Sequence, residues 1–292
     1  MYTLSNRLKI FSVALMFLGA IGWFYSYSNS HVSLEEVKTM LAEESSHGGG
    51  HGDALDSHAV AVENHVTTDN HNTEMSHNDD VHDSEHAEHV MHQIHNRPYA
   101  ALYVAAFFFM MIALGVLAFY AIQYASQAGW SPVLYRVMEA ITYYLLPGAL
   151  IVLLIAIIGD KHIFIWMDPE VVAHDELIQG KSSWLNKPWF IIRALIFIGG
   201  WSLYRYFSRK FSLAQDNDSG NKFFKLNFRI SAGFLVFFIY TESMMSWDWI
   251  MSVDPHWFST LFGWYLLASM LVSGITVIAL ITIYLKSKGH LD

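Results

Sequence analysis

Six long apolar runs divide the chain. The first covers residues 9–28, and the others cover roughly 99–126, 134–159, 188–207, 229–252 and 258–285. A helix of about 20 apolar residues crosses the ~30 Å hydrocarbon core of a membrane, so each run predicts a transmembrane helix. The short links at 127–133 and 253–257 predict antiparallel helical hairpins. The expected fold class is an all-α membrane protein with about six transmembrane helices.

Residues 29–96 differ from these runs. They hold 12 of the 16 histidines and 14 acidic residues, with Lys38 as the one lysine. Apart from a short helix predicted for SLEEVKTMLAEE (33–44), the segment has no periodic apolar face and is expected to be a disordered loop. Imidazoles bind Zn, Cu and Ni, but the histidine spacings are irregular and the membrane runs offer no matching relay. A solvated spacer is therefore favoured over a metal-binding segment, and no metal site is assigned.

These patterns predict four parts: a transmembrane anchor at 1–28, the extracytoplasmic His-rich loop at 29–96, a transmembrane four-helix bundle at 97–257, and the first helix of a second bundle at 258–292. A cleaved signal peptide is the alternative for the first part. The run is longer than a signal core, however, and its end lacks the small-residue cleavage pattern. The sixth run stops shortly before Asp292, so further helices are expected beyond it.

Composition and charge agree with a membrane location. The chain is 53% hydrophobic and 15% charged, whereas soluble domains carry about 25% charged residues. The absence of cysteine excludes disulfides and thiolate-bound clusters, and no basic patch suggests nucleic acid as a partner. Of the 17 lysines and arginines, 11 fall on the side of the N-terminus and five on the other. By the positive-inside rule, both chain ends are cytoplasmic and the His-rich loop is periplasmic.

The fifth run carries carboxylates at membrane depth, where a charged side chain costs ~2.5 to 3.5 kcal/mol. Such residues persist where they face protein, water or a ligand. Glu242 is accordingly either a carboxyl that exchanges protons or one that hydrogen-bonds across helices to hold the bundle together. Helical spacing places polar side chains on two faces of this run, which neighbouring helices would have to enclose: Glu242, Ser246 and Trp249 on one face, and Thr241, Met245, Asp248 and Ser252 on the other.

The third run begins with Arg136 and Glu139 one turn apart, followed by Tyr143 and Pro147. The favoured interpretation is a simple ion pair at the cytoplasmic surface. The alternative is that Glu139 opens a proton inlet leading toward Glu242. The proline removes one backbone donor and should loosen the helix.

Arg193 lies about one turn inside the fourth run. Snorkelling toward the interface is favoured, and the alternative is that it neutralises Asp248 or Asp254 on a facing helix. The connecting segment 160–187 contains apolar stretches that predict a folded cap over the bundle.

Four segments resemble the ActF-type membrane subunit of alternative complex III, a bacterial quinol:cytochrome c or quinol:oxidase oxidoreductase. The most specific is SAGFLVFFIYTESMMSWDWIMSVDPHWFSTLFGWY (231–265), and the others are residues 96–115, 129–148 and 162–182. The resemblance runs across almost the whole chain. It implies a helical subunit of the polysulfide-reductase (NrfD-like) type, with two four-helix bundles plus peripheral helices. Family members have about ten spans, so this chain would correspond to the first bundle and one helix of the second.

The resemblance also implies partners and cofactors. The partners would be a paralogous quinol-binding membrane subunit, an iron–sulfur subunit and a multihaem cytochrome c subunit, with a terminal oxidase as a further candidate, all surrounded by lipids. Menaquinol or another quinol, haem c and iron–sulfur clusters would serve the complex, with none bound by this chain.

The implied role is a proton pathway, without catalytic turnover of its own, coupled to quinol oxidation in a neighbouring subunit. The alternatives are a quinone-binding subunit, a structural scaffold and, last, a metal-ion transporter. The quinone alternative would place the head group near His162, Trp166 and Asp168. The proton-pathway candidates are Glu139, Tyr143, Glu242, Ser246, Asp248, Asp254 and His256, with Arg193 as a counter-charge.

Overall fold

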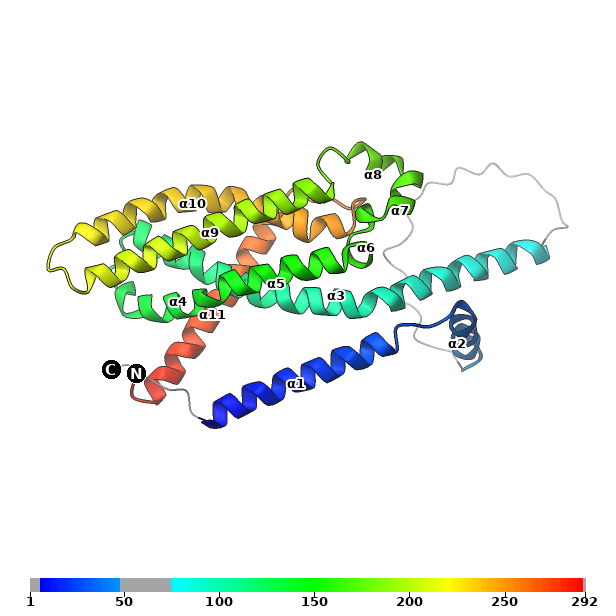
Figure 1. The fold of residues 1–292 in the computed structure, drawn as a ribbon, viewed down its shortest axis with the longest axis horizontal. Coiled ribbons are helices and arrows are strands. Elements are labelled where there is room, and N and C mark those ends of the chain that lie inside the picture. Colours follow the sequence, from blue (N-terminus) through cyan, green and yellow to red (C-terminus); the bar gives the residue numbers. More distant parts are fainter. Residues whose placement is uncertain (1–5, 48–74, 291–292) are drawn as a thin grey trace. The chain divides into compact units, whose positions relative to one another are not determined.

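The computed structural model describes residues 6–47 and 75–290, and every regular element in those ranges is a helix. Six helical segments there are long and apolar enough to cross a membrane (Figure 1). They are Asn6–Ser28, His86–Ala125, Ser131–Ile158, Lys187–Gln215, Lys222–Val253 and Phe262–Ser287. Each coincides with one of the six apolar runs. The predicted all-α, multi-pass membrane fold is therefore confirmed.

The first of two compact units reaches to Pro98. It contains α1 (Asn6–Ser28), α2 (Leu34–His47) and the first part of α3 (Met75–Ala125). The predicted short helix is confirmed as α2, and its start is fixed by Ser33, whose N–H donates to Glu36 Oε2 over 2.9 Å. The Nε1–H of Trp23 donates to the Pro98 carbonyl over 3.0 Å.

The prediction of disorder is wrong for residues 75–96, which form the beginning of α3. This stretch contains neither glycine nor proline, so nothing in it breaks a helix, although it lacks an apolar face. Residues 48–74, which hold the Gly-rich part of the predicted loop, lie outside the described residues.

The second unit begins at Tyr99 and holds the remaining spans. The third run is divided into η1 (Ser131–Leu134), α4 (Tyr135–Ile141), η2 (Thr142–Tyr144) and α5 (Leu145–Ile158). The tightened η2 turn lies just before Pro147, whose missing N–H removes an α-helical hydrogen bond at this point. Next come α9 (Lys187–Gln215), α10 (Lys222–Trp249), η4 (Met251–Val253) and α11 (Phe262–Ser287).

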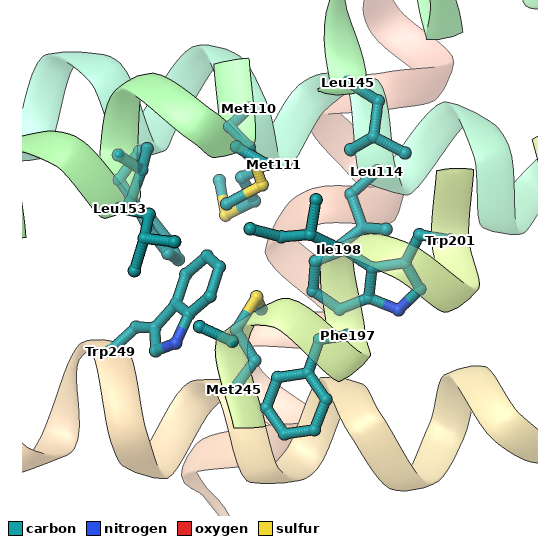
Figure 2. Packing of buried hydrophobic residues seen from close by; sticks show 14 of the residues in the cluster. Met110, Met111, Leu114, Leu145, Leu153, Phe197, Ile198, Trp201, Met245 and Trp249 are labelled. Atoms are coloured by element: carbon teal, nitrogen blue, oxygen red, sulfur yellow. The ribbon is translucent and has the colours of Figure 1, made fainter. Parts of the chain in front are cut away.

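The buried faces of α3, α5, α9, α10 and α11 share one hydrophobic core (Figure 2). Its largest fully buried side chains include Trp201 of α9 and Trp249 of α10. A Cβ on Gly115 of α3 would lie 2.2 Å from the Met270 carbonyl oxygen of α11, so glycine permits this close helix crossing. α11 thus packs on the same core as the others, and the membership of residues 258–292 in a second bundle stays a prediction.

The segment between α5 and α9 is folded, as predicted, and we call residues 160–186 the cap. It consists of α6 (Asp160–Ile163), η3 (Ile165–Met167), α7 (Pro169–His174) and α8 (Glu176–Gly180). Its apolar side chains Phe164, Trp166 and Ile178 are buried in the core. We call the opposite end of the bundle, where Arg136 and Arg209 lie, the basic end.

Candidate functional site

Glu242 is buried inside the bundle, with 1% of its surface exposed. All seven side chains predicted to lie on the two enclosed faces of α10 are buried, which confirms the expectation that neighbouring helices surround it. The Ser243 hydroxyl lies 3.4 Å from Glu242 Oε2. Glu242 Oε1 has no hydrogen-bond partner among the described residues. A buried polar atom without a partner costs about 1 to 3 kcal/mol, so this carboxyl is an exception that needs a reason.

Asp248, six residues after Glu242 on α10, is held by several donors. Arg193 donates from Nε to Oδ2 over 2.5 Å and from Nη2 to Oδ1 over 3.1 Å. Trp184 of the cap donates its Nε1–H to Oδ1 over 2.8 Å, and its ring lies 4.2 Å from the guanidinium. The snorkelling prediction for Arg193 is therefore wrong, and its alternative, neutralisation of Asp248, is right. A two-point, charge-assisted pair holds the guanidinium against the buried carboxylate.

Glu139 is the buried carboxylate of the basic end. Arg136 donates to its Oε2 over 2.7 Å, as the ion-pair interpretation predicted, and Arg209 lies 3.7 Å from the same oxygen. The hydroxyl of Tyr120 donates to Oε1 over 3.0 Å. Arg136 also pairs with the exposed Asp216. Arg136 thus contacts both the exposed Asp216 and the buried Glu139, so the predicted ion pair does not lie at the surface alone.

Three polar pairs join α9 to α10 inside the bundle, and we call them the α9–α10 polar pairs. They are Ser208–Asn227 (2.6 Å, hydroxyl to Oδ1), Tyr204–Ser231 (2.7 Å between hydroxyl oxygens) and Trp201–Thr241 (3.0 Å, Nε1–H to hydroxyl). All six side chains are buried. Sequence reasoning missed all three pairs and placed only Thr241 on an enclosed helix face. The signal was present in the four-residue spacings between Tyr204 and Ser208 and between Asn227 and Ser231, which repeat a helix face.

Other proton-pathway candidates do not join this interior set. Tyr143 is 71% exposed, and its ring packs under the guanidinium of Arg205, 4.9 Å away. Asp254 is exposed in the turn after α10. Ser246 is buried next to Glu242, but its hydroxyl donates to the Ser243 carbonyl of its own helix over 2.7 Å. Of the candidates, the structure therefore buries Glu242, Ser246 and Asp248 on α10, places Arg193 against Asp248, and leaves Tyr143 and Asp254 at the surface.

His256, another candidate, belongs to contacts between the cap and the α10–α11 turn. Its Nε2 lies 2.7 Å from Asp175 Oδ2. The Ile178 backbone N–H and then the His256 ring lower the pKa of Asp175. Lys181 donates to the Pro255 carbonyl over 2.5 Å. These contacts fasten the turn to the cap and do not extend into the bundle.

The three residues proposed for a quinone head group serve different structural purposes. His162 stacks on Tyr99 with ring centroids 4.3 Å apart. Trp166 is packed in the core, and its Nε1–H has no partner in the described part of the chain. Asp168 caps α7, accepting from the Glu170 N–H over 3.0 Å. Two of them thus take part in forming the cap, and the third fills the core.

An apolar cavity of about 650 Å³ lies at the cap end, between α3, the end of α10 and α11. Trp249 lines it, and the indole N–H of this residue has no acceptor within the described ranges. The Tyr103 hydroxyl, from the opposite wall, donates to the Trp249 carbonyl over 2.8 Å. Further lining residues come from α3, the turn and α11: Phe107, Met111, Asp254, Trp257, Tyr265 and Ser269. None of His162, Trp166 and Asp168 lines this cavity.

Among the side chains that the structure describes, no three histidine, aspartate or glutamate residues gather closely enough to hold a metal ion. Comparison of the sequence with protein-family models gives no match, and comparison with curated proteins gives none either. The fold and the buried polar groups define a multi-pass membrane protein that keeps ionisable side chains inside its helical bundle.

Proposed function

We propose that this chain is a proton-conducting membrane subunit of a quinol-oxidising respiratory complex of the alternative complex III type. Its place would be the bacterial inner membrane, with both described chain ends on the cytoplasmic side. The paralogous membrane subunit and the iron–sulfur and cytochrome c subunits would oxidise quinol and carry the electrons. Glu242 would carry the proton. The resemblance of residues 231–265 supports the assignment to this type of complex, and the surroundings of Glu242 support the proton-conducting role.

The setting of Glu242 is the observation on which the proton role depends. A glutamate that holds a bundle together must hydrogen-bond to another helix. The contact from Glu242 to Ser243 stays within its own helix, and Oε1 has no partner among the described residues. An open acceptor position on a buried carboxyl can receive a water molecule or a proton donor. This favours proton exchange over a purely structural role.

A possible inlet begins at the basic end with Glu139 and Tyr120. The α9–α10 polar pairs continue inward, and hydroxyl groups can accept one hydrogen bond while donating another. Between Ser231 and Thr241, however, α10 advances about 15 Å at 1.5 Å per residue, and the buried rings of Phe234 and Phe238 lie in this interval. Proton transfer would therefore require water or side-chain motion across this apolar interval.

The test is Glu242→Gln in the assembled complex, reconstituted in liposomes and supplied with quinol. A pH-sensitive dye reports proton movement while electron transfer is followed in parallel. We expect the proton-to-electron ratio to fall to the value for quinol chemistry alone, because glutamine cannot take up and release a proton. Glu170→Gln, the same change on the exposed cap helix, is the matched control and should retain the full ratio. An unchanged ratio with full turnover in Glu242→Gln would support a scaffold instead.

The cap-end cavity favours quinone binding as a second candidate function. Its aromatic lining suits a planar ring, and Asp254 and Ser269 add polar groups to its wall. A photoreactive quinone analogue should then label residues of α3 and α11 at the cavity, such as Phe107 and Tyr265. Excess natural quinone should suppress the labelling. Labelling at His162 without labelling at the cavity would count against this site.

A further inference from the structure

Arg205 of α9 is a cationic side chain without a partner of opposite charge. No described residue accepts a hydrogen bond from it, and its Nε is buried without a partner. Its guanidinium lies against the Tyr143 ring. One turn further along α9, Arg209 reaches Glu139 only at 3.7 Å, whereas Arg136 holds the same carboxylate oxygen at 2.7 Å. Arg136, Arg205 and Arg209 thus carry three positive charges against the two carboxylates Glu139 and Asp216, which leaves one positive charge in excess.

The position of Arg205 along the helix matches the level of lipid head groups. It lies two residues before the end of the apolar run 188–207, and Arg209 and Lys210 follow immediately. Arginines near the end of a transmembrane segment extend their guanidinium toward the phosphates of the adjacent leaflet. A guanidinium also matches phosphate geometry with two parallel hydrogen bonds.

An exposed apolar surface begins beside this charge. Tyr143 is exposed, and Leu146, Leu150 and Leu154 of α5 are exposed at intervals of four residues, which places them on one helix face. From Tyr143 to Leu154 the helix advances about 16 Å, close to half of the ~30 Å hydrocarbon core. A cationic group at one end and an apolar stripe one leaflet long correspond to the two parts of a phospholipid.

We propose that Arg205 and Arg209 bind the phosphate of an anionic phospholipid, with an acyl chain lying along Leu146, Leu150 and Leu154. The site is separate from the proton role of Glu242 and does not depend on it. A free phosphate ion would use the arginines alone, so the apolar stripe favours a lipid as the ligand.

Native mass spectrometry of the purified full chain can test this site with added phosphatidylglycerol, with phosphatidylcholine of the same chain length, and with inorganic phosphate. The wild type should retain phosphatidylglycerol preferentially. Arg205→Gln should weaken this retention about tenfold or more, since charge-assisted hydrogen bonds are lost. Arg205→Lys keeps the charge without the planar two-point geometry and should retain an intermediate amount. Arg229→Gln removes an exposed arginine of α10 at the same end of the bundle and serves as the charge-matched control.

Three results would overturn the proposal. One is equal retention of phosphatidylglycerol by Arg205→Gln and the wild type. Another is displacement of the bound lipid by millimolar inorganic phosphate, which would identify a free-anion site. The third is loss of a neighbouring subunit from purified complexes of Arg205→Gln with unchanged lipid content, which would show that a partner's carboxylate occupies the arginine.

Discussion

The ion pair between Arg193 and Asp248 offers the sharpest test of how this bundle is held together. Asp248 is 0% exposed and Arg193 is 11% exposed, so both charges are largely removed from water. Arg193→Met keeps much of the side-chain volume and removes the charge. The Asp248 carboxylate would then retain the Trp184 N–H as its one side-chain donor among the described residues.

The magnitude follows from the contacts that are lost. Two charge-assisted hydrogen bonds disappear, each worth about 1.5 to 3 kcal/mol, together with a cation–π contact of about 0.5 to 1 kcal/mol. The isolated carboxyl can take up a proton instead of remaining charged, which limits the penalty. We therefore expect a destabilisation of about 3 to 5 kcal/mol, the usual cost of removing one partner from a buried pair.

The assay is reversible unfolding in mixed detergent micelles, followed by circular dichroism and compared as free energies of unfolding. The double variant Arg193→Met with Asp248→Leu removes both charges and should be more stable than the Arg193→Met single variant by about 2 kcal/mol or more. Lys187→Met is the control on the same helix. It breaks a partly exposed pair with Asp160 and should cost less than about 1 kcal/mol. A cost below about 1 kcal/mol for Arg193→Met, or strict additivity of the two changes, would refute the reasoning.

Two further predictions concern helix crossing and acid. Gly115→Ala should lower the free energy of unfolding by about 1 to 3 kcal/mol, because the added Cβ meets the Met270 backbone oxygen at 2.2 Å. Gly233→Ala, where nothing lies within 4 Å of the added Cβ, should be neutral or slightly stabilising. Equal unfolding free energies for the two variants would contradict the close crossing. Burial raises the pKa of Asp160. The ammonium of Lys187 and a backbone N–H lower this pKa by more than burial raises it, so the net shift is downward. The wild type should therefore have a higher free energy of unfolding than Asp160→Asn above about pH 4, the ordinary pKa range for aspartate. This difference should vanish as the pH falls through the lowered folded-state pKa. A difference in unfolding free energy that grows on acidification would contradict this sign.

The spans could be predicted from sequence because the membrane imposes one strong requirement. A segment that crosses hydrocarbon must satisfy its backbone hydrogen bonds internally and remain apolar for about 20 residues. The six runs meet both conditions. The burial of Glu242 and Ser246 was predictable for a related reason, since helical spacing placed them on a face that could not point to lipid.

For Arg193, sequence could not decide between snorkelling and pairing with Asp248, because the choice depends on how α9 and α10 pack. Sequence spacing relates residues within one helix, whereas the register between helices is set by side-chain packing over the whole interface. The same limitation explains why Tyr204–Ser231 and Ser208–Asn227 were missed. Serine and tyrosine are common in membrane helices, and each residue alone gives no sign of a partner on a neighbouring helix.

The wrong prediction of disorder for 75–96 has a different origin. It depended on composition, namely many histidines and acids without an apolar face. Helix formation in this stretch requires only that nothing interrupts the backbone, and glycine and proline are absent until Pro98. Composition alone therefore did not predict the local conformation.

The two buried carboxylates of α10 differ in a way that divides the candidate residues by role. Asp248 accepts from Arg193 and Trp184, so any change there should act first on stability. Glu242, six residues earlier, has an oxygen without a partner among the described residues. Replacing it with glutamine removes no cross-helix bond described for it, so the fold should be largely unaffected. If Glu242→Gln instead destabilised the chain as much as Arg193→Met, the glutamate would have an undescribed structural partner and the argument for proton exchange would fail.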